Sequence, residues 1–249
     1  MPYVAVSALS HPGLVREHNE DSLVAGPWTL CATVTESPQT LVFPLRSPVV
    51  VAVADGLGGH PGGEVASALV ARLLARAGPV LGDEEAVREA LSDCNRAVYQ
   101  AAEGGDLTAM GTTVAGLVLL HDSVLVFNVG DSRVFAASSD GLRQVSVDDS
   151  PPLEPGQRTT SLVTQCLGGS AAHRDVRPHV TTVPLRPGDR YLVCTDGLTD
   201  PVTEDVLEAV MRENDDGRAA FELWHAAIQA GGPDNITLAV VRVGGDGSP

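Results

Sequence analysis

One stretch of the sequence, Val49 to Glu64, constrains the fold more than any other. It reads VVVAVADGLGGHPGGE, an apolar run followed by Asp55 and then five glycines around one histidine. A run rich in Val and Ala indicates a buried strand, and the glycines let backbone approach closely whatever the Asp55 carboxylate holds. We therefore expect the fold to be built around a central strand that delivers Asp55 to its rim.

The rest of the chain alternates between strand and helical periods. Strands are expected over residues 3–9, 22–25, 28–34, 41–45, 49–54, 111–120, 123–137, 176–183, 190–195 and 236–243. Helices are expected over residues 62–77, 83–103, 203–212 and 217–230. We expect 28–34 and 41–45 to pair as a hairpin, Val65, Leu69 and Leu73 to be the apolar stripe of the first helix, and 144–160 to form a surface flap. This order predicts an α+β fold in which helix pairs cover a mainly antiparallel sheet layer.

Charge and length narrow the classes of protein. The formal net charge is −16 and there is no lysine, which argues against nucleic acid or an anionic membrane as partner and excludes a GK[ST] phosphate loop. No linker interrupts the 249 residues, so we expect one domain over residues 1–244 with a short polar tail, 245–249.

No apolar run is long enough to span a membrane and residues 1–13 lack signal-peptide features, so we expect a cytoplasmic protein. The four isolated cysteines are typical of buried thiols.

Three expected strands border an aspartate that lies beside a small or turn-forming residue. The pairs are Asp55-Gly56, Asp196-Gly197 and Asp234-Asn235. Each pair alone is a common turn former, but three at strand termini suggest carboxylates gathered at one edge of a sheet. Gathered carboxylates repel one another unless divalent cations sit among them, and all-oxygen ligation favours Mg²⁺ or Mn²⁺.

Six short motifs in a fixed order extend this observation along nearly the whole chain. They are Arg16-x-x-Asn19-Glu20-Asp21, Asp55-Gly56-x-Gly58-Gly59-His60, Gly111-Thr112-Thr113, Val129-Gly130-Asp131-Ser132-Arg133, Cys194-Thr195-Asp196-Gly197-Leu198-x-Asp200 and Asp234-Asn235-Ile236-Thr237. Together they resemble the metal-dependent PP2C-type protein phosphatases. The form of the second motif, with Leu57 rather than a histidine after Asp55-Gly56, resembles that of the bacterial branch. The resemblance implies a four-layer αββα sandwich with a metal site between the sheet edges.

The resemblance also implies roles for individual residues. Carried over by motif position, the metal ligands would be Glu20, Asp21, Asp55, Gly56, Asp131, Asp196 and Asp234, and the catalytic residues Arg16, Asp55 and Asp196. Asp55 would bridge two Mn²⁺ or Mg²⁺ ions, and Arg16 would hold the phosphate. Asp131 with Asp196 would form a third, weaker metal site.

The implied reaction is hydrolysis of phosphoserine and phosphothreonine in proteins by a metal-bridging hydroxide. The implied partners are phosphorylated proteins and a cognate serine/threonine kinase pathway, and the chain is expected to act as a monomer. Two alternatives are a phosphatase of anti-sigma-factor antagonists and a non-catalytic relative that binds phosphoproteins. A nucleotide-binding loop is a third, but the glycine spacing after Asp55 breaks GxGxxG.

The sequence departs from the family pattern at three places. Leu57 stands where many eukaryotic members have a histidine proposed as general acid, which leaves His18, His60 or a metal-bound water as proton donor, with structural roles expected for both histidines. Asp148-Asp149-Ser150 replaces the Asp-His-Ser usual before the flap in bacterial relatives. The loop from Gly26 to Pro48 is longer than the pattern leads us to expect.

Overall fold

The computed structural model describes residues 2–57, 61–103, 107, 109–152, 159–160 and 162–245. The strands are β1 Tyr3–His11, β2 Ser22–Ala25, β3 Trp28–Cys31, β4 Gln39–Pro44, β5 Val49–Ala54, β6 Gly56–Leu57, β7 Gly111–Thr112, β8 Val114–Leu119, β9 Ser123–Val129, β10 Arg133–Ser138, β11 Gly141–Gln144, β12 Leu167–Gly168, β13 His179–Pro184, β14 Arg190–Cys194 and β15 Ile236–Gly244. The helices are α1 Pro61–Ala77, α2 Glu84–Ala102, α3 Asp196–Thr199, α4 Glu204–Glu213 and α5 Asp216–Gln229, with a 3₁₀ turn at Gly78–Val80.

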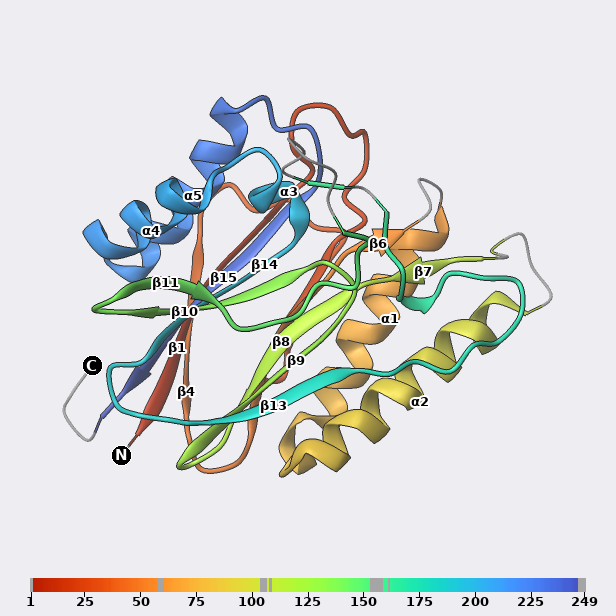
Figure 1. The fold of residues 1–249 in the computed structure, drawn as a ribbon, viewed down its shortest axis with the longest axis horizontal. Helices are drawn as coiled ribbons and strands as arrows, with labels where there is room; N and C mark the ends of the chain where they lie inside the picture. Colours follow the sequence, from red (N-terminus) through yellow and green to blue (C-terminus); the bar gives the residue numbers. More distant parts are fainter. Residues whose placement is uncertain are drawn as a thin grey trace.

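The described strands form two large antiparallel sheets and one small one (Figure 1). The first sheet has six strands in the order β11-β10-β14-β15-β1-β4, and the second has six in the order β13-β9-β8-β5-β2-β3. The small sheet has the order β12-β7-β6. Strand β5 lies inside the second sheet, between β8 and β2, which confirms the expected central strand.

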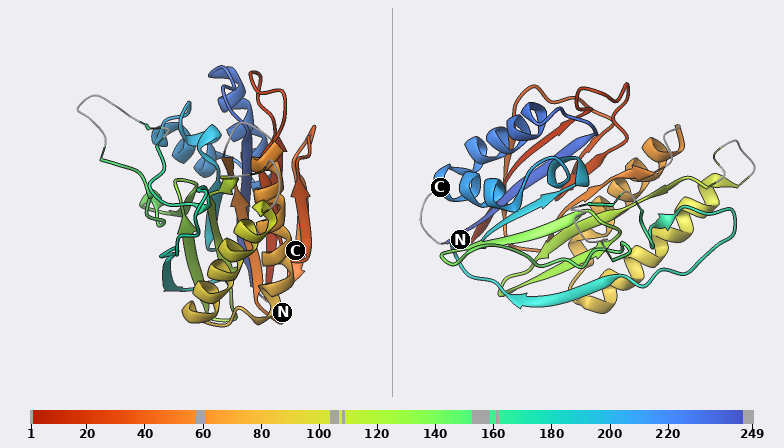
Figure 2. Two further views of the ribbon diagram at one scale, coloured as in Figure 1. Left: turned by 90° about the vertical axis from the view of Figure 1, so that its right-hand side faces the viewer. Right: turned by 45° about the horizontal axis from the view of Figure 1, so that its top comes forward.

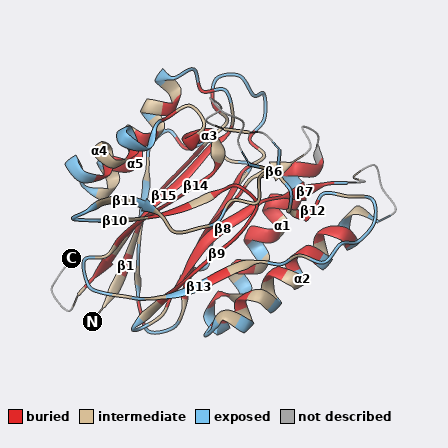
Figure 3. Cartoon of the chain, viewed as in Figure 1, coloured by how far each residue is buried: buried red, intermediate tan, exposed pale blue. Residues whose placement is uncertain are grey.

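Helix pairs cover the outer faces of the two sheets (Figure 2). Helices α1 and α2 pack on the second sheet, whereas α4 and α5 pack on the first. A third apolar cluster, with side chains such as Val193 and Leu117, lies between the sheets. Both faces of β5 and β8 are therefore buried (Figure 3), which explains why their sequences are continuously apolar rather than alternating. The α+β, four-layer expectation is confirmed.

The expected hairpin between residues 28–34 and 41–45 is wrong. Strand β3 pairs with β2 at the edge of the second sheet, whereas β4 pairs with β1 at the edge of the first. The chain leaves β3 at Ala32, whose φ of 50° is left-handed, and crosses to the other layer. Strand periodicity identifies a strand but not its partner, so adjacency in sequence was misleading here.

The apolar stripe expected on α1 is partly right: Leu69 and Leu73 pack, partly buried, against the apolar cluster on the outer face of the second sheet. The side chains fully buried against the second sheet are Ala66, Val70 and Leu74, whereas Val65 is 40% exposed. Both sets repeat every four residues, so the period fits either face. The small Ala66 lies on the buried face, close to the sheet, and the packing selects that face.

Some expectations fall on residues outside the described ranges. These include Gly58, Gly59 and His60 of the glycine-rich turn, residues 153–158 and 161 of the flap, and residues 246–249 of the tail. Within the described residues, no helix combines the length and apolar character needed to cross a membrane.

Replacing Leu117 with Ala tests the layer between the sheets. Leu117 on β8 is fully buried there, so Leu117→Ala should lower the free energy of unfolding by about 2–5 kcal/mol in urea titration. Val42→Ala is the matched control, since Val42 on β4 is 54% exposed, and it should change stability by less than about 1 kcal/mol. Equal effects of the two substitutions would contradict the layering.

Candidate active site

The predicted aspartates lie at one shared end of the two sheets. In antiparallel sheets, the end of one strand lies beside the start of its neighbour. Thus Asp55 follows β5 next to the start of β2, where Ser22 pairs with Ala54. In the first sheet, Asp196 follows β14 and Asp234 precedes β15, which pair with each other. The topology therefore brings together carboxylates that are far apart in the sequence.

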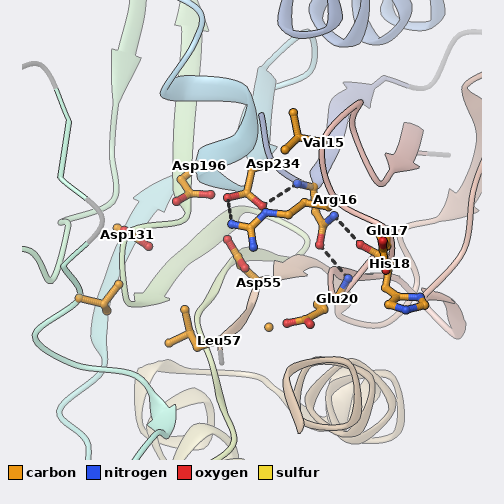
Figure 4. A pocket seen from close by; sticks show the side chains of 13 residues that line it. Val15, Arg16, Glu17, His18, Glu20, Asp55, Leu57, Asp131, Asp196 and Asp234 are labelled. Carbon is orange, nitrogen blue, oxygen red and sulfur yellow. Dashed lines mark hydrogen bonds and ion pairs between the residues drawn. The ribbon is translucent and has the colours of Figure 1, made fainter. Parts of the chain in front are cut away.

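These side chains surround a single cavity (Figure 4). Its volume is about 410 Å³, and its lining includes seven of the predicted site residues: Arg16, Glu20, Asp55, Gly56, Asp131, Asp196 and Asp234. His18, Leu57 and Val163 also line it. One cavity thus holds carboxylates from both sheets and a guanidinium from the loop after β1.

The backbone of Asp55 is held by two threonines. The Asp55 carbonyl accepts hydrogen bonds from the Thr113 N–H at 2.9 Å and the Thr112 hydroxyl at 2.7 Å, and the Asp55 N–H donates to Thr113 Oγ1 at 3.2 Å. Thr113 Oγ1 in turn lies 2.7 Å from Ser132 Oγ. The Gly111-Thr112-Thr113 motif, which had no expected role beyond the resemblance, therefore positions the central carboxylate.

Asn235 plays a similar part for the loop that carries Arg16 and Glu20. Its side-chain carbonyl accepts from the Glu20 N–H at 2.8 Å, and its amide donates to the carbonyls of His18 at 2.8 Å and Pro12 at 3.1 Å. The sequence signal for this role was an Asn directly after Asp234, which we had interpreted only as a turn former.

Arg16 crosses the cavity to the opposite wall. Its Nη2 donates to Asp234 Oδ2 at 2.7 Å, shown as a dashed line in Figure 4. The Arg16 side chain remains 50% exposed, and its hydrogen bond to Asp234 raises its pKa. The guanidinium thus neutralises one cavity carboxylate while keeping exposed surface toward solvent.

Asp21 does not line the cavity. It is fully buried behind it, where its Oδ2 accepts a hydrogen bond from Thr195 Oγ1 at 2.9 Å. Its other oxygen, Oδ1, has no hydrogen-bond partner among the described residues. This placement does not support the expected direct contact of Asp21 with a cation. Instead, the hydrogen bond from Thr195 indicates that Asp21 stabilises the turn formed by Thr195 and Asp196.

Burial and mutual repulsion raise the pKa values of three carboxyl groups in the cavity, those of Asp55, Asp131 and Asp196. Desolvation, followed by the charges of Asp196 and Asp21, raises the pKa of Asp55 well above its usual range. Desolvation is also the largest cause for Asp131, whose pKa is raised to about 7, and for Asp196. A group of carboxyls that resists ionisation near neutral pH is an environment that a bound cation would stabilise.

Other features also fit divalent cations. Asp196 Oδ1 is buried without a hydrogen-bond partner among the described residues, and a Cβ on Gly56 would lie 2.5 Å from Gly63, so backbone is packed closely against the site. Within the described ranges, no set of three or more His, Cys, Asp or Glu side chains is already arranged around one point.

Comparison with known proteins identifies the family. Residues 43–227 match the family described as protein phosphatase 2C. The chain belongs to this family. It is 32% identical over 257 aligned residues to the serine/threonine protein phosphatase PstP of Mycobacterium tuberculosis, covering 95% of this chain and 44% of PstP. It is 30% identical over 251 residues to the serine/threonine phosphatase stp of Listeria monocytogenes, covering 92% of each chain.

A solved structure of a family member carries metal. The catalytic domain of PstP in complex with two manganese ions superposes with a TM-score of 0.81 at 30% identity, covering 98% of this chain and 100% of that chain. The chain thus spans 44% of the full length of PstP but all of its crystallised catalytic domain.

The raised pKa values predict how stability depends on pH without metal. Asp131 has a folded pKa of about 7 against about 3.9 unfolded, so folding takes up a proton between these values. This contribution is complete below about pH 4 and is lost as pH rises through 7, at up to about 1.4 kcal/mol per pH unit. The melting temperature of chelated protein should therefore fall between about pH 5 and 7 and level off above pH 7, and the fall should be less steep in Asp131→Asn. A melting temperature that rises over this range in chelated protein would contradict the assignment.

Proposed function

We propose that this chain is a metal-dependent phosphatase that hydrolyses phosphoserine and phosphothreonine in proteins. The observation that carries the proposal is one cavity, at the shared end of two sheets, lined by Asp55, Asp131, Asp196, Asp234 and Arg16. Family membership supports it, as do the names of PstP and stp. We further propose that residues 1–244 form the phosphatase domain.

The cavity residues divide into oxygen ligands that would hold cations and one guanidinium, that of Arg16, which would bind phosphate. Asp55, the Gly56 carbonyl, Asp196 and Asp234 would hold two divalent cations, with Glu20 beside them and Asp131 contributing to a third site. Manganese is the first choice, because a PstP structure holds two manganese ions. Bound cations would supply a water of lowered pKa for in-line attack on phosphorus.

Arg16 would bind the phosphate of the substrate. A guanidinium matches phosphate oxygens with two parallel donors and stays charged at all working pH values. In the structure it is paired with Asp234, so cation binding at Asp234 and release of Arg16 toward the phosphate would be linked. Leu57 in the cavity wall has no proton to give, so the proton donor to the leaving alcohol would be water or His18, which also lines the cavity.

The deciding experiment is an assay of the purified chain with Mn²⁺ on a phosphothreonine peptide and on p-nitrophenyl phosphate. Asp55→Asn and Asp196→Asn should each lower kcat by at least about 100-fold, because each removes a charge proposed to hold the cations. The matched control is Asp175→Asn, since the Asp175 side chain is 98% exposed and does not line the cavity.

Absence of wild-type turnover with Mn²⁺ or Mg²⁺, or turnover that survives both substitutions, would refute the proposal. Calorimetric binding of Mn²⁺ together with absent turnover would instead indicate a regulatory relative that binds phosphoproteins.

A second measurement isolates the role of Arg16. Arg16→Ala should raise KM for the phosphopeptide by about 10-fold or more, since a hydrogen bond to a charged group contributes about 1.5–3 kcal/mol. Arg16→Lys should be intermediate, because Lys keeps the charge but not the paired donors. Arg96→Ala, at a 60% exposed position on α2, is the control. An unchanged KM in Arg16→Ala would exclude the assigned role.

A further inference from the structure

The turn that presents Asp131 to the cavity needs an external support. Gly130, just before Asp131, has a φ of +104°, and a Cβ there would lie 2.7 Å from Thr113. Glycine is therefore required at this position, and glycine also gives the backbone the most freedom to move. Asp131 itself is only 7% exposed, so small shifts of Gly130 would move its carboxylate within the cavity.

Asp149 supplies this support through both backbone groups of Gly130. The Gly130 N–H donates to Asp149 Oδ2 at 2.9 Å, and the Asp149 N–H donates to the Gly130 carbonyl at 2.9 Å. The Asp149 side chain is only 12% exposed, so these bonds are largely shielded from water. Hydrogen bonds to a shielded carboxylate are stronger than those between neutral groups.

The same carboxylate collects two further donors from other parts of the chain. Gln165 Nε2 donates to Asp149 Oδ2 at 2.9 Å, and His179 Nε2 lies 2.9 Å from Asp149 Oδ1, which makes it a donor to the carboxylate. His179 begins β13, and Gln165 is itself held by Arg177, whose N–H donates to Gln165 Oε1 at 2.6 Å. Asp149 is thus oriented by two side chains that do not line the cavity.

These contacts also join the two ends of the segment formed by residues 150–163. Asp149 precedes residues 150–163, and the N–H of Thr164, which follows them, donates to the Asp149 carbonyl at 2.7 Å. Val163, the last residue of this segment, lines the cavity. Both ends of the 150–163 segment and the Asp131 turn therefore meet at Asp149.

We propose that Asp149 is a positioning residue for cation binding at Asp131, oriented in turn by Gln165 and His179. The inference rests on the proposed function, since it gives Asp131 a cation to hold. Asp149 stands where the family pattern has histidine, so this carboxylate is a feature of the chain's own sequence and not of the shared metal motif. It contacts neither the cavity nor a substrate.

The test is Mn²⁺ binding by calorimetry, with the Mn²⁺ dependence of kcat as a second readout, on the full chain. Asp149→Ala should weaken the Asp131-dependent binding step by about 10-fold or more, as is typical when the support of a ligand is removed. Asp149→Asn should lose less Mn²⁺ affinity than Asp149→Ala, because the Asn carbonyl can still accept from the Gly130 N–H and the Asn amide can donate to His179. The Mn²⁺ affinity of Gln165→Leu should lie between that of Asp149→Asn and that of the wild type.

Two controls separate positioning from loss of stability. Asp131→Asn should remove the same binding step, and adding Asp149→Ala to it should cause no further loss of Mn²⁺ affinity. Leu117→Ala, which destabilises the layer between the sheets without touching the Asp149 contacts, should leave Mn²⁺ affinity unchanged below its melting temperature.

Wild-type Mn²⁺ binding in Asp149→Ala, additive losses in the double variant, or an equal loss in Leu117→Ala would each overturn the inference. Asp149→Ala behaving as wild type would leave the proposed function intact, whereas a wild-type chain without Mn²⁺-dependent turnover would remove both.

Discussion

Four carboxyl groups converge at the shared end of two sheets, and their mutual repulsion is a cost that the fold overcomes. Asp55, Asp131, Asp196 and Asp234 line a single cavity, and burial together with neighbouring charges raises the pKa values of Asp55, Asp131 and Asp196. Sheet pairing and apolar packing elsewhere hold the strands that carry them. The fold thereby maintains a carboxylate cluster that would not assemble by itself.

Three polar residues around the cavity hold the backbone of the segments that carry its carboxyl groups. Thr113 holds Asp55, Asn235 holds the Glu20 loop and Asp149 holds Gly130, each through main-chain N–H or carbonyl groups. Arg16 is the exception, since it pairs directly with Asp234, and it carries a positive charge into the cavity of a chain whose formal net charge is −16.

The sequence predicted the elements better than their partners. Strand β5 and helices α1, α2, α4 and α5 lie where periodicity placed them, because burial imposes a period that a single segment reveals. The hairpin of residues 28–34 with 41–45 was wrong, since pairing depends on which layer offers an open edge. The stripe on α1 was only partly right, with Leu69 and Leu73 packed against the core and Val65 exposed, since a period of four fits two neighbouring faces and only packing against the sheet distinguishes them.

The order of residues alone identifies the candidate ligands, because an aspartate at the end of an apolar strand is visible in it. Seven of the eight predicted site residues line the cavity. Only the tertiary structure decided that Asp21 lies behind it, that Arg16 reaches Asp234, and that Asp149 joins Gly130 to Gln165 and His179. The physical reason is the same in each case. Burial and hydrogen bonding between residues distant in sequence depend on how the two sheets are stacked, and no local pattern records that stacking.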